Sequence, residues 1–304
     1  MMRYEVKSFI LMVINFDRKR EHLGGTMIEV IPTTVFADGP NGGNPCPVIL
    51  GADNYSDEEM RALAEELSAE VGFILATNRP ACDYQFRFFV PNKEMTMCGH
   101  ATIACATVLY DRSQRPIKSL TIETLAGDIP IEFLPMEEGI QVSVAQKAGH
   151  FESINVSKET IAQALNISCQ QIVSETIYNA STSKPKTLIA LDSRETLDNL
   201  RPQLFKLWDI CDMVDSSGFY PYVQVADDVF FARQFPNNSG YDEDAATGVA
   251  ASALGAFVAH NLNNEIPLLT VYQGQAMERP SKIQVKDAGK MNAIVGHANI
   301  LVTD

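Results

Sequence analysis

The sequence predicts an α/β protein of two related halves, each with a sheet wrapped on a buried helix. The chain has 304 residues, which is longer than a domain with one hydrophobic core usually is and suits two domains. Strand-like runs alternate with amphipathic helical segments along the chain. In addition, residues 98–104 are similar to residues 247–253. Each has a small polar residue, then glycine, then an alanine-rich helix that is apolar nearly all round, as fully buried helices are.

The first half opens with a strand and continues with a surface helix and further strands. Ser56 and Glu59 have the spacing of a capping box, which predicts a helix beginning after Ser56. Apolar residues then recur at helical spacing from Met60 to Leu67, so one face packs on a sheet. Period-two and β-branched runs predict strands at 28–36, 71–77, 84–89, 120–124, 128–133 and 140–144.

The second half repeats this alternation. Ser157 can cap a helix that runs through Leu165. Strands are predicted at 188–191, 222–226, 229–234, 268–273, 283–285, 292–295 and 300–302. The expected boundary is the stretch 147–155, where Gly149 accompanies a lapse in apolar periodicity. We therefore expect one half at 27–146 and the other at 147–304, with a last strand that can cross back to the first half.

Residues 1–26 fit poorly with the pattern that follows them. Met27 stands directly before the first clean strand, and Leu23-Gly24-Gly25-Thr26 can be encoded by a ribosome-binding sequence. We expect translation to start at Met27, which makes residues 1–26 an N-terminal extension that arises from an upstream start.

Composition excludes several classes of partner. The formal net charge of −14 argues against nucleic acid and against an anionic membrane surface, since both attract basic faces. The longest apolar run near the start, 9–14, is too short to span a bilayer. Six cysteines without a C-x-x-C pair or a disulfide-type framework predict reduced thiols. We expect a cytoplasmic protein.

Three ionisable residues are the candidates for catalysis: Glu70, His100 and Asp244. Each lies among small or apolar residues, and two carboxylates with an imidazole in one cavity are the groups that proton transfer needs. Each also has a structural alternative. His100 can be a satisfied core residue, Asp244 a helix N-cap, and Glu70 a solvated charge at a helix end.

Two helix starts are candidates for binding an anion. Small residues at Gly99 and Gly248 allow a ligand to approach the N–H groups of a first helical turn, at the positive end of the helix dipole. Two such starts could hold a carboxylate without lysine or arginine. The alternative is that both glycines only permit tight packing.

Cys98 raises two further possibilities. Cofactor-independent racemases use two opposed cysteines at paired helix starts, but the second position here is Thr247, whose hydroxyl is too weak an acid. A metal site at Cys98 and His100 lacks further ligands, so we predict no metal.

Six segments together resemble the phenazine biosynthesis-like (PhzF-like) family within the diaminopimelate-epimerase fold. They are spread over most of 27–290: VFADGPNGGNP at 35–45, EVGF at 70–73, CGHAT at 98–102, ETLAG at 123–127, EDAATG at 243–248 and QGQAMERPS at 273–281. Two departures are Ala245, where proline is usual, and Cys98, where the phenazine enzyme need not have a thiol.

The resemblance implies two halves, each a strongly curved, mostly antiparallel sheet around a central helix, with the active site in the cleft between them. It implies a homodimer without metal or organic cofactor. The founding activity of the family isomerises trans-2,3-dihydro-3-hydroxyanthranilate by a proton shift. By motif position, Glu70 matches the glutamate that moves the proton, while His100 and Asp244 match its partners. The predicted substrate-binding residues are Asn44, Cys98, Gly99, Ala101, Thr247 and Gly248.

We therefore predict a cofactor-independent isomerase of a small carboxylate-bearing molecule. Two alternatives remain open. One is an amino-acid racemase or epimerase, against which the missing second cysteine weighs. The other is a metabolite-binding protein without catalysis, which would have no use for three convergent titratable groups.

Overall fold

The computed structural model describes residues 28–137, 139–263 and 265–301. They form two compact units: unit 1 comprises 28–145 with 296–301, and unit 2 comprises 146–295. The predicted extension 1–26 and the predicted start at Met27 lie outside the described residues. Within the described ranges, no helix combines the length and apolar character needed to cross a membrane.

Unit 1 is a mixed, mostly antiparallel sheet with two helices. Its elements are β1 (Glu29–Val35), β2 (Asn44–Leu50), α2 (Asp57–Leu67), β3 (Val71–Leu75), β4 (Tyr84–Val90), β5 (Lys93–Met95), α3 (Gly99–Arg112), β6 (Ser119–Thr124), β7 (Gly127–Pro135), β8 (Ile140–Ala145) and β18 (Ala298–Ile300). The strands lie in the order β18, β1, β2, β3, β4, β6, β7 and β8, with β5 also paired to β4. Only β2–β3 and β4–β6 are parallel among these pairs.

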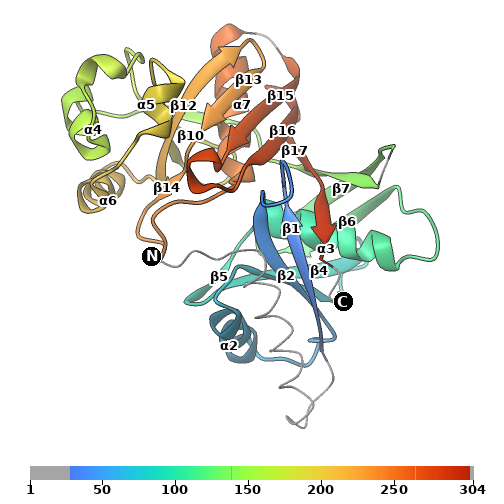
Figure 1. Cartoon of the computed structure of the whole chain (residues 1–304). Coiled ribbons are helices and arrows are strands. Elements are labelled where there is room, and N and C mark those ends of the chain that lie inside the picture. Colours follow the sequence, from blue (N-terminus) through green and yellow to red (C-terminus); the bar gives the residue numbers. More distant parts are fainter. Residues whose placement is uncertain (1–27, 138, 264, 302–304) are drawn as a thin grey trace. The chain divides into compact units, whose positions relative to one another are not determined.

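The helix α3 is the centre of unit 1. Its residues from Gly99 to Val108 are buried, and it contacts β8 and β18, which lie at opposite ends of the strand order. The sheet therefore curls around the helix (Figure 1). Alanine, cysteine and threonine dominate this helix, and their small side chains let strands approach it on several sides.

The amphipathic helix α2 covers the other face of the same sheet. The predicted capping box is present, with Glu59 N–H donating to Ser56 Oγ and Ser56 N–H donating to the Glu59 carboxylate. Met60, Leu63 and Leu67 pack with Val71 and Phe73 in one buried cluster. Because alternate residues of a strand point to opposite faces, the intervening Gly72 faces α3.

Unit 2 repeats the arrangement of unit 1. Its elements are β9 (His150–Ser153), α4 (Lys158–Leu165), η2 (Cys169–Gln171), β10 (Tyr178–Ser181), β11 (Lys186–Ala190), α5 (Arg194–Asp198), α6 (Leu204–Met213), β12 (Gly218–Ala226), β13 (Val229–Ala232), β14 (Phe235–Pro236), α7 (Gly248–Leu262), β15 (Ile266–Gln273), η3 (Gln275–Met277), β16 (Ser281–Ala288) and β17 (Ala293–Gly296). The strand order is β9, β10, β11, β12, β13, β15, β16 and β17, with β14 also paired to β12.

The two sheets share their pattern of strand directions. In unit 2 the parallel pairs are β11–β12 and β13–β15, which correspond to β2–β3 and β4–β6 of unit 1. The helix α7 occupies the place of α3, because it lies in the chain between β13 and β15, as α3 lies between β4 and β6. It contacts β10, β11, β15 and β16. The segments 98–104 and 247–253, which are similar in sequence, are thus the starts of the two central helices.

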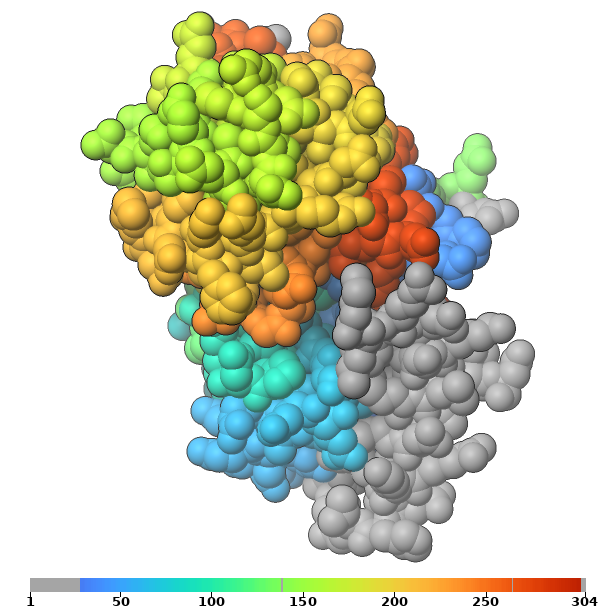
Figure 2. All heavy atoms as spheres, turned by 60° about the vertical axis from the view of Figure 1, so that its left-hand side comes forward, coloured from blue at the N-terminus to red at the C-terminus, as the bar shows by residue number. Residues whose placement is uncertain are grey.

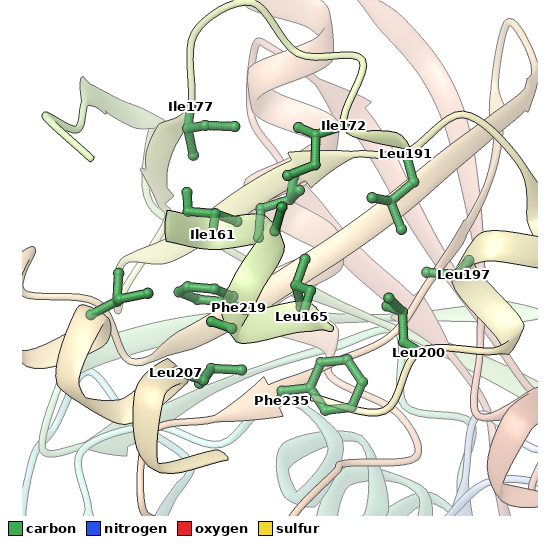
Figure 3. Packing of buried hydrophobic residues seen from close by; sticks show 14 of the residues in the cluster. Ile161, Leu165, Ile172, Ile177, Leu191, Leu197, Leu200, Leu207, Phe219 and Phe235 are labelled. Atoms are coloured by element: carbon green, nitrogen blue, oxygen red, sulfur yellow. The ribbon is translucent and has the colours of Figure 1, made fainter. Parts of the chain in front are cut away.

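A second core of unit 2 lies on the other face of its sheet. The helices α4 and α6 contact each other, and both α5 and α6 contact β12. Figure 2 shows α4 in lime and α6 in gold on one face of the molecule. Beneath them, Leu165, Leu207, Phe219 and Phe235 point toward one another (Figure 3), and all four are buried.

Most predicted elements are present, with several differences. The strand predicted at 71–77 ends at Leu75, and the one predicted at 229–234 ends at Ala232, while β14 at Phe235–Pro236 was not predicted. The last strand runs from Ala298 to Ile300, and Val302 of the prediction lies outside the described residues. The strands β2, β5, β9 and β10 and the helices α5 and α6 were not predicted.

Candidate active site

Glu70 lies between the end of α2 and the start of β3. The helix ends at Leu67, and Ser68 takes a left-handed conformation with φ of 47° while its N–H donates to Ala64 O and Glu65 O. The strand begins at Val71, which pairs with Phe89. Glu70 is therefore held by a capped helix on one side and a paired strand on the other.

Gly72 brings β3 onto the central helix. A Cβ atom at this position would lie 2.5 Å from Cys105 Sγ and 3.5 Å from Ala101 O, both on α3. Real Cβ contacts are not that short, so any larger residue here must push the Cys105 thiol aside. This close approach places Glu70, two residues earlier, beside the first turn of α3.

Glu70, Cys98 and His100 form one cluster at the start of α3. His100 Nε2 lies 3.0 Å from Glu70 Oε2, and their side chains are 6% and 21% exposed. Cys98 Sγ lies 3.3 Å from His100 Nδ1 and 3.5 Å from Glu70 Oε2. The structure thus brings together two of the three predicted catalytic residues and one predicted substrate-binding residue.

The protonation state of Cys98 sets the direction of these hydrogen bonds. Burial raises the pKa of the Cys98 thiol well above its usual range, and the nearby Glu70 carboxylate and Cys46 act in the same direction. A thiol that keeps its proton donates either to Glu70 Oε2 at 3.5 Å or to His100 Nδ1 at 3.3 Å, and in the second case Nδ1 is the acceptor. The imidazole then carries its own proton on Nε2 and donates it to Glu70. The cluster is therefore a hydrogen-bonded relay that ends on a carboxylate.

The other predicted residues of unit 1 lie at the ends of β2 and α3. Asn44 is the first residue of β2 and pairs with Val35 of β1. Before it, Gly43 has φ of +88°, and a Cβ there would lie 2.7 Å from Val35 O, so the turn into β2 requires glycine. Gly99 and Ala101 are buried in the first turn of α3.

In unit 2, Asp244 is fixed by its backbone and by Thr247. Its N–H donates to Gln234 O at 3.0 Å, and its carbonyl accepts from Gln273 Nε2 at 2.7 Å. Its carboxylate Oδ2 accepts from Thr247 Oγ1 at 2.5 Å. Thr247 is the N-cap residue of α7, and Gly248 is the first residue of that helix. The three predicted residues of unit 2 thus lie together.

Gln273 and Tyr220 belong to this arrangement and were not predicted as site residues. Both are fully buried. Gln273 Oε1 accepts from Tyr220 Oη–H at 3.0 Å and from Thr247 N–H at 3.3 Å, while its Nε2 also donates to Thr247 Oγ1 at 3.0 Å. Gln273 is a polar residue at the end of a mostly apolar strand, and this position is the sequence feature by which it could have been predicted.

A buried ion pair anchors the residue before Asp244. Arg233 donates to both carboxylate oxygens of Glu243, at 2.8 and 2.7 Å, and the side chains are 7% and 13% exposed. The third donor, Arg233 Nη1, binds the carbonyl oxygens of Leu197 and Leu200 at 2.9 and 3.1 Å. Glu243 therefore has a structural contact of its own, which fixes the chain on the N-terminal side of Asp244.

Arg279 is a further charged residue near Asp244 that was not predicted. Burial lowers the pKa of its guanidinium, and the negative charge of Asp244 acts in the opposite direction. An acidic chain thus places a partly buried cation close to the Asp244 carboxylate.

The two central helices begin in the same way. Their N-cap residues are Cys98 and Thr247, and in the described part of the chain neither side chain forms a cap hydrogen bond to its own helix. The position equivalent to Cys98 carries a hydroxyl instead of a second thiol, as the sequence indicates.

Comparisons with known proteins place this geometry in context. A sequence model of the family described as phenazine biosynthesis-like protein (PhzC-PhzF) matches residues 33–303. The uncharacterized isomerase YfhB of Bacillus subtilis is 27% identical over 282 residues, covering 90% of this chain and 94% of that protein. A crystal structure of a PhzF-family phenazine biosynthesis protein from Bacillus anthracis is 27% identical, with a TM-score of 0.81 over 91% of this chain and 98% of that one.

A more distant structure shares the fold. A probable proline racemase from Agrobacterium radiobacter is 12% identical, with a TM-score of 0.63 over 90% of this chain and 91% of that one. The predicted fold class is confirmed by these structures and by the two similar sheet-and-helix units.

Proposed function

Because the chain belongs to the phenazine biosynthesis-like (PhzC-PhzF) family, we propose that it is an isomerase that moves a proton within a small carboxylate-bearing molecule. The observation that carries this proposal is the buried relay from Cys98 through His100 to Glu70. The isomerase name of the relative YfhB supports the reaction class.

In this proposal Glu70 is the group that carries the proton. Its carboxylate takes a proton from one carbon of the substrate, the electron pair shifts along a conjugated system, and the proton returns to another carbon. Atoms and electrons balance within one molecule, so the reaction needs no oxidant, reductant or organic cofactor. His100 donates a hydrogen bond to Glu70 and orients it, while the protonated Cys98 keeps the His100 tautomer fixed.

The proposal assigns substrate binding to the helix starts and to the residues around them. The N–H groups of the first turns of α3 and α7 favour a carboxylate. Arg279 adds a cation close to Asp244, so recognition of the anion does not depend on helix dipoles alone. Asp244 is the proposed partner of Glu70 and His100 in proton relay. Asn44, Gly99, Ala101, Thr247 and Gly248 are the proposed substrate-binding positions.

A ligand screen tests the proposal. Small conjugated carboxylates are added to wild type, Glu70→Gln and Glu66→Gln, and the melting temperature is measured. A ligand that binds the folded state raises it. Glu66 is exposed on α2 and serves as a control for the same change of charge. Each hit is then incubated with all three proteins and followed by NMR.

We expect a hit that raises the melting temperature of all three proteins. Wild type and Glu66→Gln should convert it, and Glu70→Gln should do so about 10²–10⁴-fold more slowly, the usual range for a lost general base. A shared hit that no protein converts would favour a metabolite-binding protein instead.

We also propose the homodimer and the cytoplasmic location. None of the six cysteines, all of which lie in the described ranges, forms a disulfide, which supports a reducing compartment. Light scattering of the purified protein and fractionation of cells test these two points.

A further inference from the structure

We propose that Glu70, Cys98 and His100 bind one zinc ion, and that the bound ion inhibits the enzyme. The donor atoms are Glu70 Oε2, Cys98 Sγ and His100 Nε2, which lie within 4.8 Å of one another. The sequence alone offers only two neighbouring donors, Cys98 and His100. The fold supplies the third from a residue 28 positions earlier in the chain.

The distances between the donor atoms suit tetrahedral zinc. Bond lengths of about 2.3 Å to sulfur and about 2.0–2.2 Å to nitrogen and oxygen give donor separations of roughly 3.3–3.6 Å. The observed separations are 3.9 Å from Cys98 Sγ to His100 Nε2, 3.5 Å from Cys98 Sγ to Glu70 Oε2, and 3.0 Å from His100 Nε2 to Glu70 Oε2. Small side-chain rotations close these differences, and the fourth position of the ion is open to water or a ligand oxygen.

Charge and ligand type select zinc over harder cations. A thiolate and a carboxylate carry two negative charges, so a divalent ion leaves the occupied cluster neutral, which suits its burial. Thiolate and imidazole favour zinc over magnesium or calcium, which prefer oxygen ligands. Cys98 must lose its proton when the metal binds.

The inhibitory effect follows from what the ion occupies, and this part rests on the proposed function. A zinc ion on Glu70 Oε2 occupies the carboxylate that would take the proton from the substrate. On His100 Nε2 the ion replaces the proton that this nitrogen donates to Glu70, so the hydrogen bond between the two side chains is lost. The apparent turnover should therefore fall as zinc is added and return when a chelator removes it.

Cobalt spectroscopy tests the site without an activity measurement. The full chain, reduced with a phosphine and freed of chelators, is titrated with Co²⁺. We expect intense visible bands of tetrahedral cobalt and a thiolate-to-cobalt charge-transfer band, both saturating at one equivalent and both removed by Zn²⁺. In Cys98→Ser the charge-transfer band should be lost, and in Glu70→Gln the affinity should fall at least about tenfold.

Two control variants separate this cluster from other thiols and carboxylates. Cys82 and Cys169 are the partly exposed thiols, and Cys169 lies 3.5 Å from the Glu159 carboxylate, so Cys82→Ser/Cys169→Ser removes the competing sites. This variant and Glu66→Gln should keep the wild-type spectrum, and the melting temperatures verify that every variant is folded.

A charge-transfer band that persists in Cys98→Ser, or its absence in wild type, would overturn the metal site. Either result leaves the proposed function standing, since that function is tested by turnover of Glu70→Gln without metal. Zinc bound at Cys98 without any loss of turnover would overturn the inhibitory role.

Discussion

Replacing Gln273 with leucine should reduce the free energy of unfolding by about 2–6 kcal/mol. Leucine has nearly the same volume, so no large cavity forms, and the loss comes from hydrogen bonds. The fully buried Tyr220 hydroxyl loses its acceptor at 3.0 Å, and an unsatisfied buried donor costs about 1–3 kcal/mol. The Thr247 N–H loses an acceptor at 3.3 Å and the Asp244 carbonyl loses the donor Gln273 Nε2 at 2.7 Å, and each loss adds about 0.5–1.5 kcal/mol.

Urea denaturation measures this loss in unit 2 specifically. Trp208 is the only tryptophan of the chain and lies in α6, so its fluorescence reports the unfolding of unit 2. Tyr220→Phe is the matched variant, because it removes the donor and leaves Gln273 Oε1 bound to Thr247 N–H.

The double variant decides whether the unsatisfied hydroxyl causes the loss. Gln273→Leu/Tyr220→Phe no longer buries a hydroxyl without an acceptor, so it should be more stable than Gln273→Leu alone. If the two single losses instead add in the double variant, or if Gln273→Leu costs less than about 1 kcal/mol, the hydrogen-bond account of this residue is refuted.

Two further predictions concern packing and pH. Gly72→Ala should destabilise the protein by about 1–3 kcal/mol through overpacking, because its Cβ would lie 2.5 Å from Cys105 Sγ. Circular dichroism during urea denaturation measures this, and Cys105→Ala in the same protein should recover part of the loss; no recovery would contradict the contact. Burial raises the pKa of Cys211 to about 12, whereas an unfolded thiol titrates near about 8.5. Between these two pKa values the unfolded state loses the thiol proton, whereas the folded state keeps it. As the pH rises through this range, the free energy of unfolding should therefore fall by about 1.4 kcal/mol per pH unit because of this thiol. Cys211→Ala should remove that part of the slope, and an unchanged slope in Trp208 fluorescence would exclude this origin.

Elements with their own caps and periodicity could be predicted from the sequence. The helices after Ser56 and Ser157 begin where their capping residues predict, and both N-cap side chains accept the expected hydrogen bonds. The helix α6 has Gln203 at its N-cap, without a side-chain cap, and no local signal marks its start. The strand β2 contains Pro45 and Pro47, residues that favour turns and edges, although it pairs with β1 and β3 on both sides.

The candidate site was predicted only where short motifs carry it. Glu70 and His100 stand in motifs of the family, and their contact at 3.0 Å fits the predicted relation between them. The contacts of Gln273 join residues that lie 26 to 53 positions apart, so no local pattern specifies them. The same holds for the third donor of the proposed zinc site. Short sequence motifs identify the residues that could act in catalysis. Their hydrogen-bond partners come from distant parts of the chain and depend on how the sheet curls around each helix.

The most direct test of the central claim is the turnover of a screened carboxylate in D₂O by wild type and Glu70→Gln, followed by NMR. Our account predicts that wild type forms an isomer of the ligand with a shifted double bond. It predicts that Glu70→Gln binds the same ligand with a similar rise in melting temperature and leaves it unchanged. Conversion by Glu70→Gln at the wild-type rate would contradict the account, because the proton would then be moved by another group.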